Sequence, residues 1–312
     1  ALLVWPAWPI RETGSLRVLG VQGNADAGLY ADYNRGDNLR DHYEVTRELY
    51  DEDVDVVIWP ENASDIDPLR YADAAAVVSE VSRELGAPLV VGAITKDGDE
   101  SYNSMLLWEW DERSGRGVAR DQYDKIHPVP FAEYLPEREF FYPLAPALFS
   151  MIPRDYSFGE RDTVFSVDGA LAGIAICFDI VDDEILWSIM GEGADIIFAP
   201  TNNADFGRTD QSVQQLAIAR LRAIETGRSV VNVSTVGTSA IMDPRGETLD
   251  RLPVYTEGYM IQDVPLSNTL TPATALGRNL ETFVIGFTLS GLVVAMVSHR
   301  GRVQRRESAP RT

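Results

Sequence analysis

The 312-residue sequence is poor in cysteine and histidine, two residue types on which many catalytic and metal sites depend. Its one cysteine, Cys177, excludes an internal disulfide, and no Cys/His cluster has the spacing of a zinc site. The three histidines, His42, His127 and His299, lie far apart along the chain. They predict neither a metal centre nor a Ser-His-Asp triad, so we expect no metal and no cofactor.

Basic charge is also scarce, because the formal net charge at pH 7 is −21. A nucleic-acid partner is therefore not expected, since binding to a phosphate backbone requires a basic surface. The few positive charges are unevenly distributed: from His299 onward there are five arginines and one glutamate. An acidic body with a basic tail predicts that these two parts face different surroundings.

The first ten residues contain no basic residue, so they do not form a complete signal peptide. Trp5 and Trp8 lie in a short apolar run, as at the interfacial end of a membrane helix. An ordinary frayed terminus with two packed tryptophans is the alternative. We therefore interpret residues 1–15 as the end of a membrane helix or a linker.

The chain is 45% hydrophobic and 24% charged, which is typical of a folded protein with a large core. Short apolar runs predict strands at 17–22, 54–59, 89–94, 102–110, 117–123, 171–176, 195–199, 229–234 and 239–242. Apolar spacing and terminal glycines predict helices at 38–50, 71–85, 184–190 and 211–226. The alternation of strands and helices predicts a layered α/β fold.

Two other segments depart from this pattern. Residues 124–162 hold six prolines and several aromatic residues, and a loop of this length is typical of a lid or a binding surface. Phe283–Ser298 carries no charge and is followed by arginines. That arrangement predicts a transmembrane helix at 280–299 and a basic cytoplasmic tail at 300–312, with the acidic body outside the cytoplasm. A buried core helix is the alternative.

Three polar residues stand at the ends of predicted strands. Glu61 follows the strand 54–59, Lys125 follows 117–123, and Cys177 follows 171–176. Each alone has an ordinary explanation: a surface charge, a loop charge or a small core residue. If the strand ends meet, the carboxylate is able to deprotonate the thiol and the ammonium group to stabilise an oxyanion. Together they predict acyl transfer through a thioester.

The residues around these three positions resemble the nitrilase, or carbon–nitrogen hydrolase, superfamily. The matching motifs are Trp59-Pro-Glu61, Tyr123 to Pro136, and Ile176-Cys-Phe-Asp179. Further motifs are similar to the apolipoprotein N-acyltransferase branch: Val21 to Asn24, Tyr102-Asn-Ser104, Ala219 to Arg228, and Gly237 to Ala240. The resemblance covers roughly Leu16 to Pro265, and several motifs together are more specific than any one of them.

The resemblance implies a four-layer α-β-β-α sandwich over residues 16–270. It implies a Cys-Glu-Lys triad in which Cys177 is the nucleophile, Glu61 the general base and Lys125 the oxyanion partner. Glu133 and Asp179 are expected to support the site through hydrogen bonds. We expect His127, Phe131 and Phe178 to contact the substrate. The remaining lid aromatics form either an acyl-chain funnel or ordinary loop packing: Phe140, Phe141, Tyr142 and Phe149.

By the same resemblance, Cys177 takes an acyl chain from a membrane phospholipid. The thioester then acylates the α-amine of a lipoprotein's amino-terminal diacylglyceryl-cysteine. The family embeds this domain in a bundle of membrane helices, which implies a multi-pass plasma-membrane protein with an extracytoplasmic catalytic domain. The resemblance leaves room for a fused or associated membrane enzyme as a further partner.

Two alternatives stay open at this point. One is an amidase or nitrilase-type hydrolase, in which water resolves the thioester, and the other is an inactive membrane scaffold. The sequence also departs from the family pattern in two places. Phe178-Asp179 stands where Tyr-Glu is usual. Thr201 to Gly207 replaces a run that usually carries Asp and then Ala-Trp-Phe, so the usual tryptophan is missing. The first departure bears on the role of Asp179, and the second bears on the selection of acyl chains.

Overall fold

The computed structural model describes residues 8–25, 34–150, 152 and 155–307. The chain divides into two compact units, Ala1–Leu270 and Thr271–Thr312. The predicted amino-terminal segment 1–15 falls partly outside the described residues, because the description begins at residue 8.

The first unit contains two six-stranded sheets, and the first sheet has the strand order β12-β1-β2-β3-β4-β5. Its strands are β1 (Glu12–Gln22), β2 (Val56–Ile58), β3 (Leu89–Asp97), β4 (Glu100–Asp111), β5 (Arg116–Asp124) and β12 (Gly258–Ser267). The second sheet has the order β11-β10-β9-β8-β7-β6. Its strands are β6 (Val164–Val167), β7 (Ala170–Ile174), β8 (Ile196–Thr201), β9 (Ser229–Ser234), β10 (Ala240–Met242) and β11 (Thr248–Arg251).

Each sheet has a parallel centre flanked by antiparallel strands. The parallel strands are β1-β2-β3 in the first sheet and β7-β8-β9 in the second. The flanking strands pair antiparallel on both sides of each centre. Polar residues that follow the parallel strands therefore gather at the carboxyl edges of the sheets, where open α/β sheets place their ligands.

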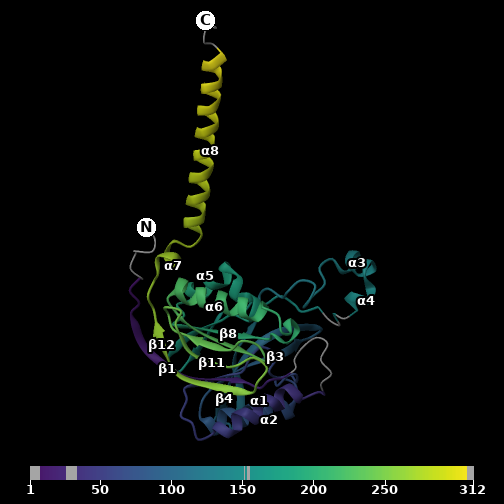
Figure 1. Cartoon of the computed structure of the whole chain (residues 1–312). Coiled ribbons are helices and arrows are strands. Elements are labelled where there is room, and N and C mark those ends of the chain that lie inside the picture. The colour runs from purple at the N-terminus through teal and green to yellow at the C-terminus, as the bar shows by residue number, and fades with distance from the viewer. Residues whose placement is uncertain (1–7, 26–33, 151, 153–154, 308–312) are drawn as a thin grey trace. The chain divides into compact units, whose positions relative to one another are not determined.

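Helices cover the outer faces of the two sheets (Figure 1). The first pair is α1 (Asp37–Thr46), which continues as η2 (Arg47–Leu49), and α2 (Ala72–Leu85). The second pair is α5 (Asp183–Gly191) and α6 (Gln211–Thr226). Glycines end α2 and α6, because Gly86 and Gly227 adopt left-handed φ angles of +61° and +66° there. Two 3₁₀ turns complete this part: the five-residue η4 (Cys177–Val181) and the three-residue η5 (Ala204–Phe206).

Three hydrophobic clusters correspond to the three interfaces between layers. The central cluster joins the two sheets, with Ile58 and Val90 from the first and Ile174 and Phe198 from the second. A second cluster packs α1 and α2 on the first sheet, and a third packs α5 and α6 on the second. The implied α-β-β-α order of layers is thus the order observed in the described residues.

The edge strands β6, β11 and β12 have no counterpart among the strands predicted from the sequence. The exposure of these strands explains why the sequence pattern missed them. β11 is mostly exposed, and β12 mixes buried and exposed positions without strict alternation. β6 is four residues long. A run that is neither continuously apolar nor strictly alternating carries a weak strand signal.

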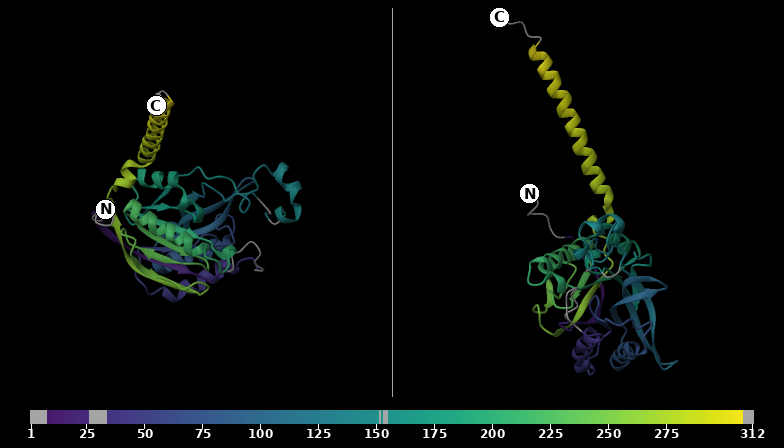
Figure 2. Two further views of the ribbon diagram at one scale, coloured as in Figure 1. Left: turned by 45° about the horizontal axis from the view of Figure 1, so that its top comes forward. Right: turned by 90° about the vertical axis from the view of Figure 1, so that its right-hand side faces the viewer.

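The loop predicted to be a lid contains short helical turns. They are α3 (Arg138–Phe141), η3 (Tyr142–Leu144) and α4 (Pro146–Phe149). Figures 1 and 2 show α3 and α4 away from the sheets, at the end of a long excursion. A small cluster of Leu135, Phe149 and Ile152, with Phe141 against it, holds this segment together.

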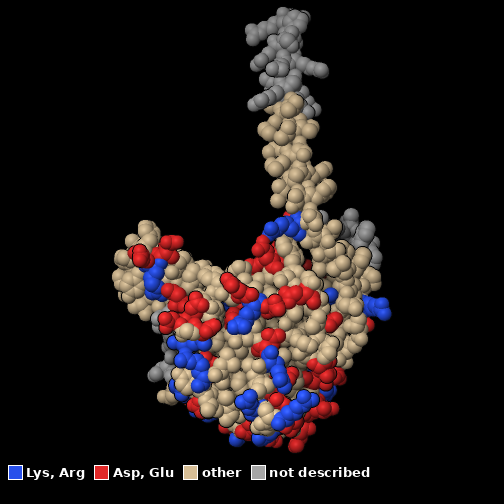
Figure 3. Space-filling view, turned by 180° about the vertical axis from the view of Figure 1, so that it is seen from behind, with Lys and Arg blue, Asp and Glu red and all other residues tan. Residues whose placement is uncertain are grey.

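The second unit consists of α7 (Pro272–Leu276) and the long helix α8 (Arg278–Glu307). Residues 282–297 of α8 include no acidic or basic residue, and Figure 3 shows a stretch of this helix entirely in tan. Its large apolar side chains are exposed, among them Phe283, Phe287 and Val297. Within the described part of the chain, no helix combines the length and the apolar character needed to cross a membrane. The transmembrane span predicted at 280–299 is therefore unconfirmed.

Candidate active site

Glu61 and Lys125 meet at the carboxyl edge of the first sheet. Glu61 lies three residues beyond β2, and Lys125 is the residue after β5. The Lys125 Nζ atom is 3.2 Å from Glu61 Oε1, and both side chains are almost fully buried. Gly92 on β3 permits this arrangement, because a Cβ atom there would lie 2.8 Å from the Glu61 Cα atom.

A second carboxylate, Glu133, completes the surroundings of Lys125. Its Oε2 atom is 2.8 Å from Lys125 Nζ and accepts a 2.6 Å hydrogen bond from the backbone N–H of Val129. The Asn103 amide joins the two carboxylates, because Nδ2 donates to Glu61 at 2.6 Å and to Glu133 at 2.9 Å. We call Glu61, Lys125, Glu133 and Asn103 the ionic cluster.

Lys125 stays cationic in this cluster. Burial by itself lowers the pKa of Lys125, but Glu61, Cys177, Glu133 and Asp179 together hold it well above its usual range. A buried ammonium group of this kind is a ready donor to an oxygen that gains negative charge during a reaction.

Cys177 stands at the turn where the second sheet meets η4. The residue has a φ of +51°, a left-handed conformation that is strained for a side chain with a Cβ atom. The residue is partly buried, and its sulfur accepts a 3.4 Å hydrogen bond from Gln215 Nε2. Burial and the charge of Glu61 raise the pKa of the Cys177 thiol to about 12, although Lys125, Thr201 and Gln215 oppose the shift. The resting thiol is thus neutral at neutral pH and requires a base for nucleophilic attack.

Glu61 is oriented from both sheets. While Lys125 and Asn103 bind its Oε1 atom, its Oε2 atom accepts a 2.6 Å hydrogen bond from the backbone N–H of Asn202, which directly follows β8. Glu61 also contributes to the pKa of Cys177. The structure therefore brings Glu61, Lys125, Glu133 and Cys177 into one electrostatically coupled group.

Asp179 is fully buried, and its charge acts on Lys125. Its Oδ2 atom accepts hydrogen bonds from the Tyr123 hydroxyl at 2.8 Å and from the Ile176 backbone N–H at 3.1 Å. Burial raises the pKa of Asp179 to about 7, while Lys125 and the hydrogen bonds act in the opposite direction. The bond to Tyr123 links η4 to β5, so Asp179 connects the turn that carries Cys177 to the strand that precedes Lys125.

The three residues predicted to contact substrate have different surroundings. His127 Nε2 lies 3.2 Å from Asp182 Oδ2, and both side chains are partly exposed. Phe178 is 45% exposed directly beside Cys177. Phe131 packs in the lid, with ring centroids 5.3 Å from Phe141 and 6.2 Å from Phe149. Their contact with a substrate stays a prediction.

Several residues that shape the site were not among the site residues predicted from the sequence. Asn103 lies within one of the matched motifs, but its place between two carboxylates depends on residues 42 and 30 positions away. Asn202 acts through its backbone, and Gln215 is one of several polar residues on α6. A search for polar residues after each parallel strand would have found Asn202, whereas no local pattern marks Gln215.

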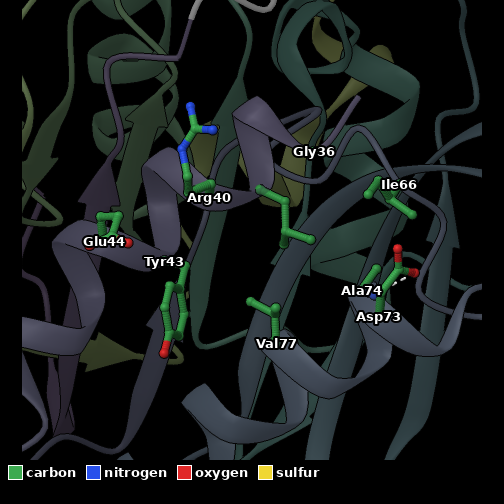
Figure 4. Close-up of a pocket in the computed structure, with 9 residues that line it drawn as sticks. Gly36, Arg40, Tyr43, Glu44, Ile66, Asp73, Ala74 and Val77 are labelled. Carbon is green, nitrogen blue, oxygen red and sulfur yellow. Dashed lines mark hydrogen bonds between the residues drawn. The ribbon is translucent and has the colours of Figure 1, made fainter. Parts of the chain in front are cut away.

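A surface pocket lies elsewhere, between α1 and α2 (Figure 4). Tyr43 and Val77 contribute to its apolar lining, and Arg40, Glu44 and Asp73 contribute charged groups. Glu61, Lys125 and Cys177 are not among the residues that line it. Among the described residues, no group of three or more His, Cys, Asp or Glu side chains is arranged to hold a metal ion.

Comparisons with known proteins agree with this fold. Residues 21–271 match the model of the family described as carbon-nitrogen hydrolase. The chain is similar to a Mycolicibacterium smegmatis apolipoprotein N-acyltransferase, with 33% identity over 98% of this chain and 54% of the relative. A Vibrio cholerae apolipoprotein N-acyltransferase is 28% identical over 86% of this chain and 53% of the relative. The chain thus spans about half the length of these curated relatives.

Solved structures are similar in fold. An amidase from Nesterenkonia sp. superposes with a TM-score of 0.59 and 17% identity, covering 83% of this chain and 94% of the amidase. A Saccharomyces cerevisiae member of the nitrilase superfamily gives a TM-score of 0.58 at 17% identity, covering 88% of this chain and 97% of that protein.

Proposed function

The chain belongs to the carbon–nitrogen hydrolase family, and on that premise we propose that it is the catalytic part of an apolipoprotein N-acyltransferase. The proposed reaction moves a fatty acyl chain from a phospholipid to the amino terminus of a lipoprotein. Its main support is the arrangement of Lys125 Nζ 3.2 Å from Glu61, with the Cys177 thiol under the influence of both charges. The names of the relatives supply the choice of substrate.

In the first half-reaction, Glu61 accepts the thiol proton of Cys177, and the sulfur attacks the ester carbonyl of the phospholipid. Lys125 stabilises the oxyanion that forms. When the carbon–oxygen bond breaks, Glu61 returns the proton to the departing alcohol oxygen, and a lysophospholipid leaves. The acyl chain is then held as a thioester on Cys177.

In the second half-reaction, the α-amine of a diacylglyceryl-cysteine attacks the thioester carbonyl. Glu61 accepts a proton from the amine and transfers it to the departing sulfur, so that an amide forms and the thiol is restored. Glu133 and Asn103 keep Lys125 and Glu61 in position in both halves, because they bind these two side chains directly. Asp179 holds the turn that carries Cys177.

A membrane setting follows from the same proposal. The uncharged residues 283–298 of α8, whose described large apolar side chains are exposed, would lie in the plasma membrane, with the arginines after them in the cytoplasm. The acidic catalytic unit would then lie on the extracytoplasmic side. His127, Phe131 and Phe178 would contact the acyl chain or the headgroup, and any fused or associated membrane enzyme would lie beyond this chain.

The test uses the full chain in detergent with phospholipid vesicles and a synthetic diacylated lipopeptide. Mass spectrometry should detect an acyl adduct on Cys177 after phospholipid is added, and a triacylated peptide after the peptide is added. We expect Cys177→Ser to reduce transfer at least about a thousandfold without changing the circular dichroism spectrum. Retained transfer in Cys177→Ser refutes the assignment.

The two alternatives give different results in the same assay. A hydrolase of this family would release free fatty acid, or ammonia from simple amides, without acylating the peptide. An inactive scaffold would form no adduct on Cys177 at all.

A further inference from the structure

The Cys177 sulfur has a neutral hydrogen-bond donor besides the charged groups of the site. Gln215, on α6, directs its Nε2 atom to the sulfur at 3.4 Å. The side chain is half-buried, and the sequence separation of 38 residues makes this a tertiary contact. Nothing in the two proposed half-reactions assigns Gln215 a part.

A set of hydrogen bonds determines which end of the Gln215 amide faces the sulfur. Its Oε1 atom accepts from Asn203 Nδ2 at 2.7 Å and from the Thr201 hydroxyl at 3.1 Å. Since a carbonyl oxygen that accepts two hydrogen bonds is held on that side, the NH₂ group is directed at Cys177. The amide is thus a donor to the sulfur rather than an acceptor from the thiol.

The Asn203 amide is oriented in the same way, by Ser234 and Gly237. Its Oδ1 atom accepts a 2.9 Å hydrogen bond from the Ser234 hydroxyl, whose oxygen in turn accepts from the Gly237 backbone N–H at 2.9 Å. Asn203 and Ser234 are buried, and a Cβ atom at position 237 would collide with the Asn203 amide. We call Gly237, Ser234, Asn203 and Gln215 the amide relay.

We propose that Gln215 is a further catalytic residue, whose amide donates to the Cys177 sulfur as it becomes a thiolate. Asn203 acts as a positioning residue that keeps this donor directed at the sulfur. Thr201 binds the Gln215 carbonyl oxygen and also lowers the pKa of the Cys177 thiol directly. A hydrogen bond to the charged form of an acid favours that form, so the donor makes the thiol easier to ionise. The charged groups that face the same sulfur, Glu61 and Lys125, have opposite effects on it. The inference rests on the proposed function for the role of Cys177 as the nucleophile.

The experiment measures the rate at which iodoacetamide alkylates Cys177 in the full chain between pH 7 and 9. Cys177 is the one cysteine of the sequence, so thiol alkylation is assigned to it unambiguously. In Gln215→Leu, we expect the rate at pH 8 to fall about three- to tenfold. The loss of one hydrogen bond reduces the thiolate fraction, and higher nucleophilicity offsets part of this. Gln214→Leu, an exposed neighbour on α6, is the matched control and should alkylate like the wild type.

A second variant leaves Gln215 in place and reverses its amide. In Asn203→Asp, a carboxylate replaces the Nδ2 donor, which would draw the NH₂ group of Gln215 toward residue 203 and turn Oε1 toward the sulfur. We expect a loss at least as large as in Gln215→Leu. In the double variant, Asn203→Asp should add almost nothing to Gln215→Leu, because its effect passes through the same amide.

The outcomes separate this inference from the proposed function. An unchanged alkylation rate in Gln215→Leu, with wild-type circular dichroism, overturns the inference, whether or not phospholipid acylates Cys177. A reduced rate together with no acyl adduct in the wild type supports the hydrogen bond from Gln215 to the sulfur and contradicts the proposed acyl transfer. If Asn203→Asp lowers the rate equally with and without Gln215, its charge acts directly on the sulfur and the orienting role is refuted.

Discussion

The two sheets supply different kinds of groups to one site. The first sheet contributes charge, because Glu61 and Lys125 follow its strands and belong to the ionic cluster. The second sheet contributes Cys177, the proposed nucleophile, and beside it the neutral amides and hydroxyls of the amide relay. The difference suggests a division of work: one side moves the proton and stabilises charge, while the other holds the sulfur and controls its ionisation.

The largest expected effect comes from removing Glu61, the proposed general base of the ionic cluster. Glu61→Gln should reduce acyl transfer about 10²- to 10⁴-fold, the usual contribution of general acid–base catalysis. The same variant should alkylate with iodoacetamide about two- to fivefold faster at pH 8, because the charge of Glu61 raises the pKa of Cys177. Measuring the acyl-transfer rate and the alkylation rate in one preparation tests whether the two sheets have these separate roles. A parallel fall in both rates would contradict it.

A smaller effect, chiefly on stability, is expected from Lys125→Met. This change leaves the buried Glu61 and the partly buried Glu133 without their cation, so we expect the free energy of unfolding to fall by about 3–5 kcal/mol. Alkylation of Cys177 should also slow, since Lys125 lowers the pKa of the thiol. Urea unfolding gives the first quantity. Lys96→Met, at an exposed position, is the matched control and should unfold at the wild-type urea concentration.

The smallest effect concerns the link between the two sides, the hydrogen bond from Tyr123 to Asp179. The pKa of Asp179 is about 7 in the folded protein, above its unfolded value of 3.8. Between these values the folded state binds more protons than the unfolded state, so this group's contribution to stability falls as pH rises from about 4 to about 7. Asp179→Asn should therefore gain stability relative to the wild type over that range, by at most a few kcal/mol.

Unfolding of both proteins at pH 5, 6, 7 and 8 measures this difference. The exposed Asp121→Asn serves as the control and should show a difference independent of pH. A difference between Asp179→Asn and the wild type that stays constant from pH 5 to 8 would mean that Asp179 does not titrate in this way.

Much of the fold could be predicted because its signals are local. Continuous apolar runs identified the parallel strands β2, β3, β8 and β9, and glycines at 86 and 227 identified the ends of two helices. The apolar run also predicted a strand at 171–176, whereas β7 ends at Ile174 and the chain then turns toward Cys177. Buried residues continue through Ile176, and burial alone does not distinguish a strand from the extended segment after it.

By itself, the sequence determined the succession of buried strands and the presence of a carboxylate, an ammonium group and a thiol after three of them. Only the tertiary structure decided which groups orient these three: Asn103 between two carboxylates, Asp179 against Tyr123, and the Gln215 amide on the sulfur. The reason is physical. Strand and helix patterns depend on neighbours a few positions away, whereas a hydrogen bond joins atoms that the packing of two sheets brings together from distant parts of the chain.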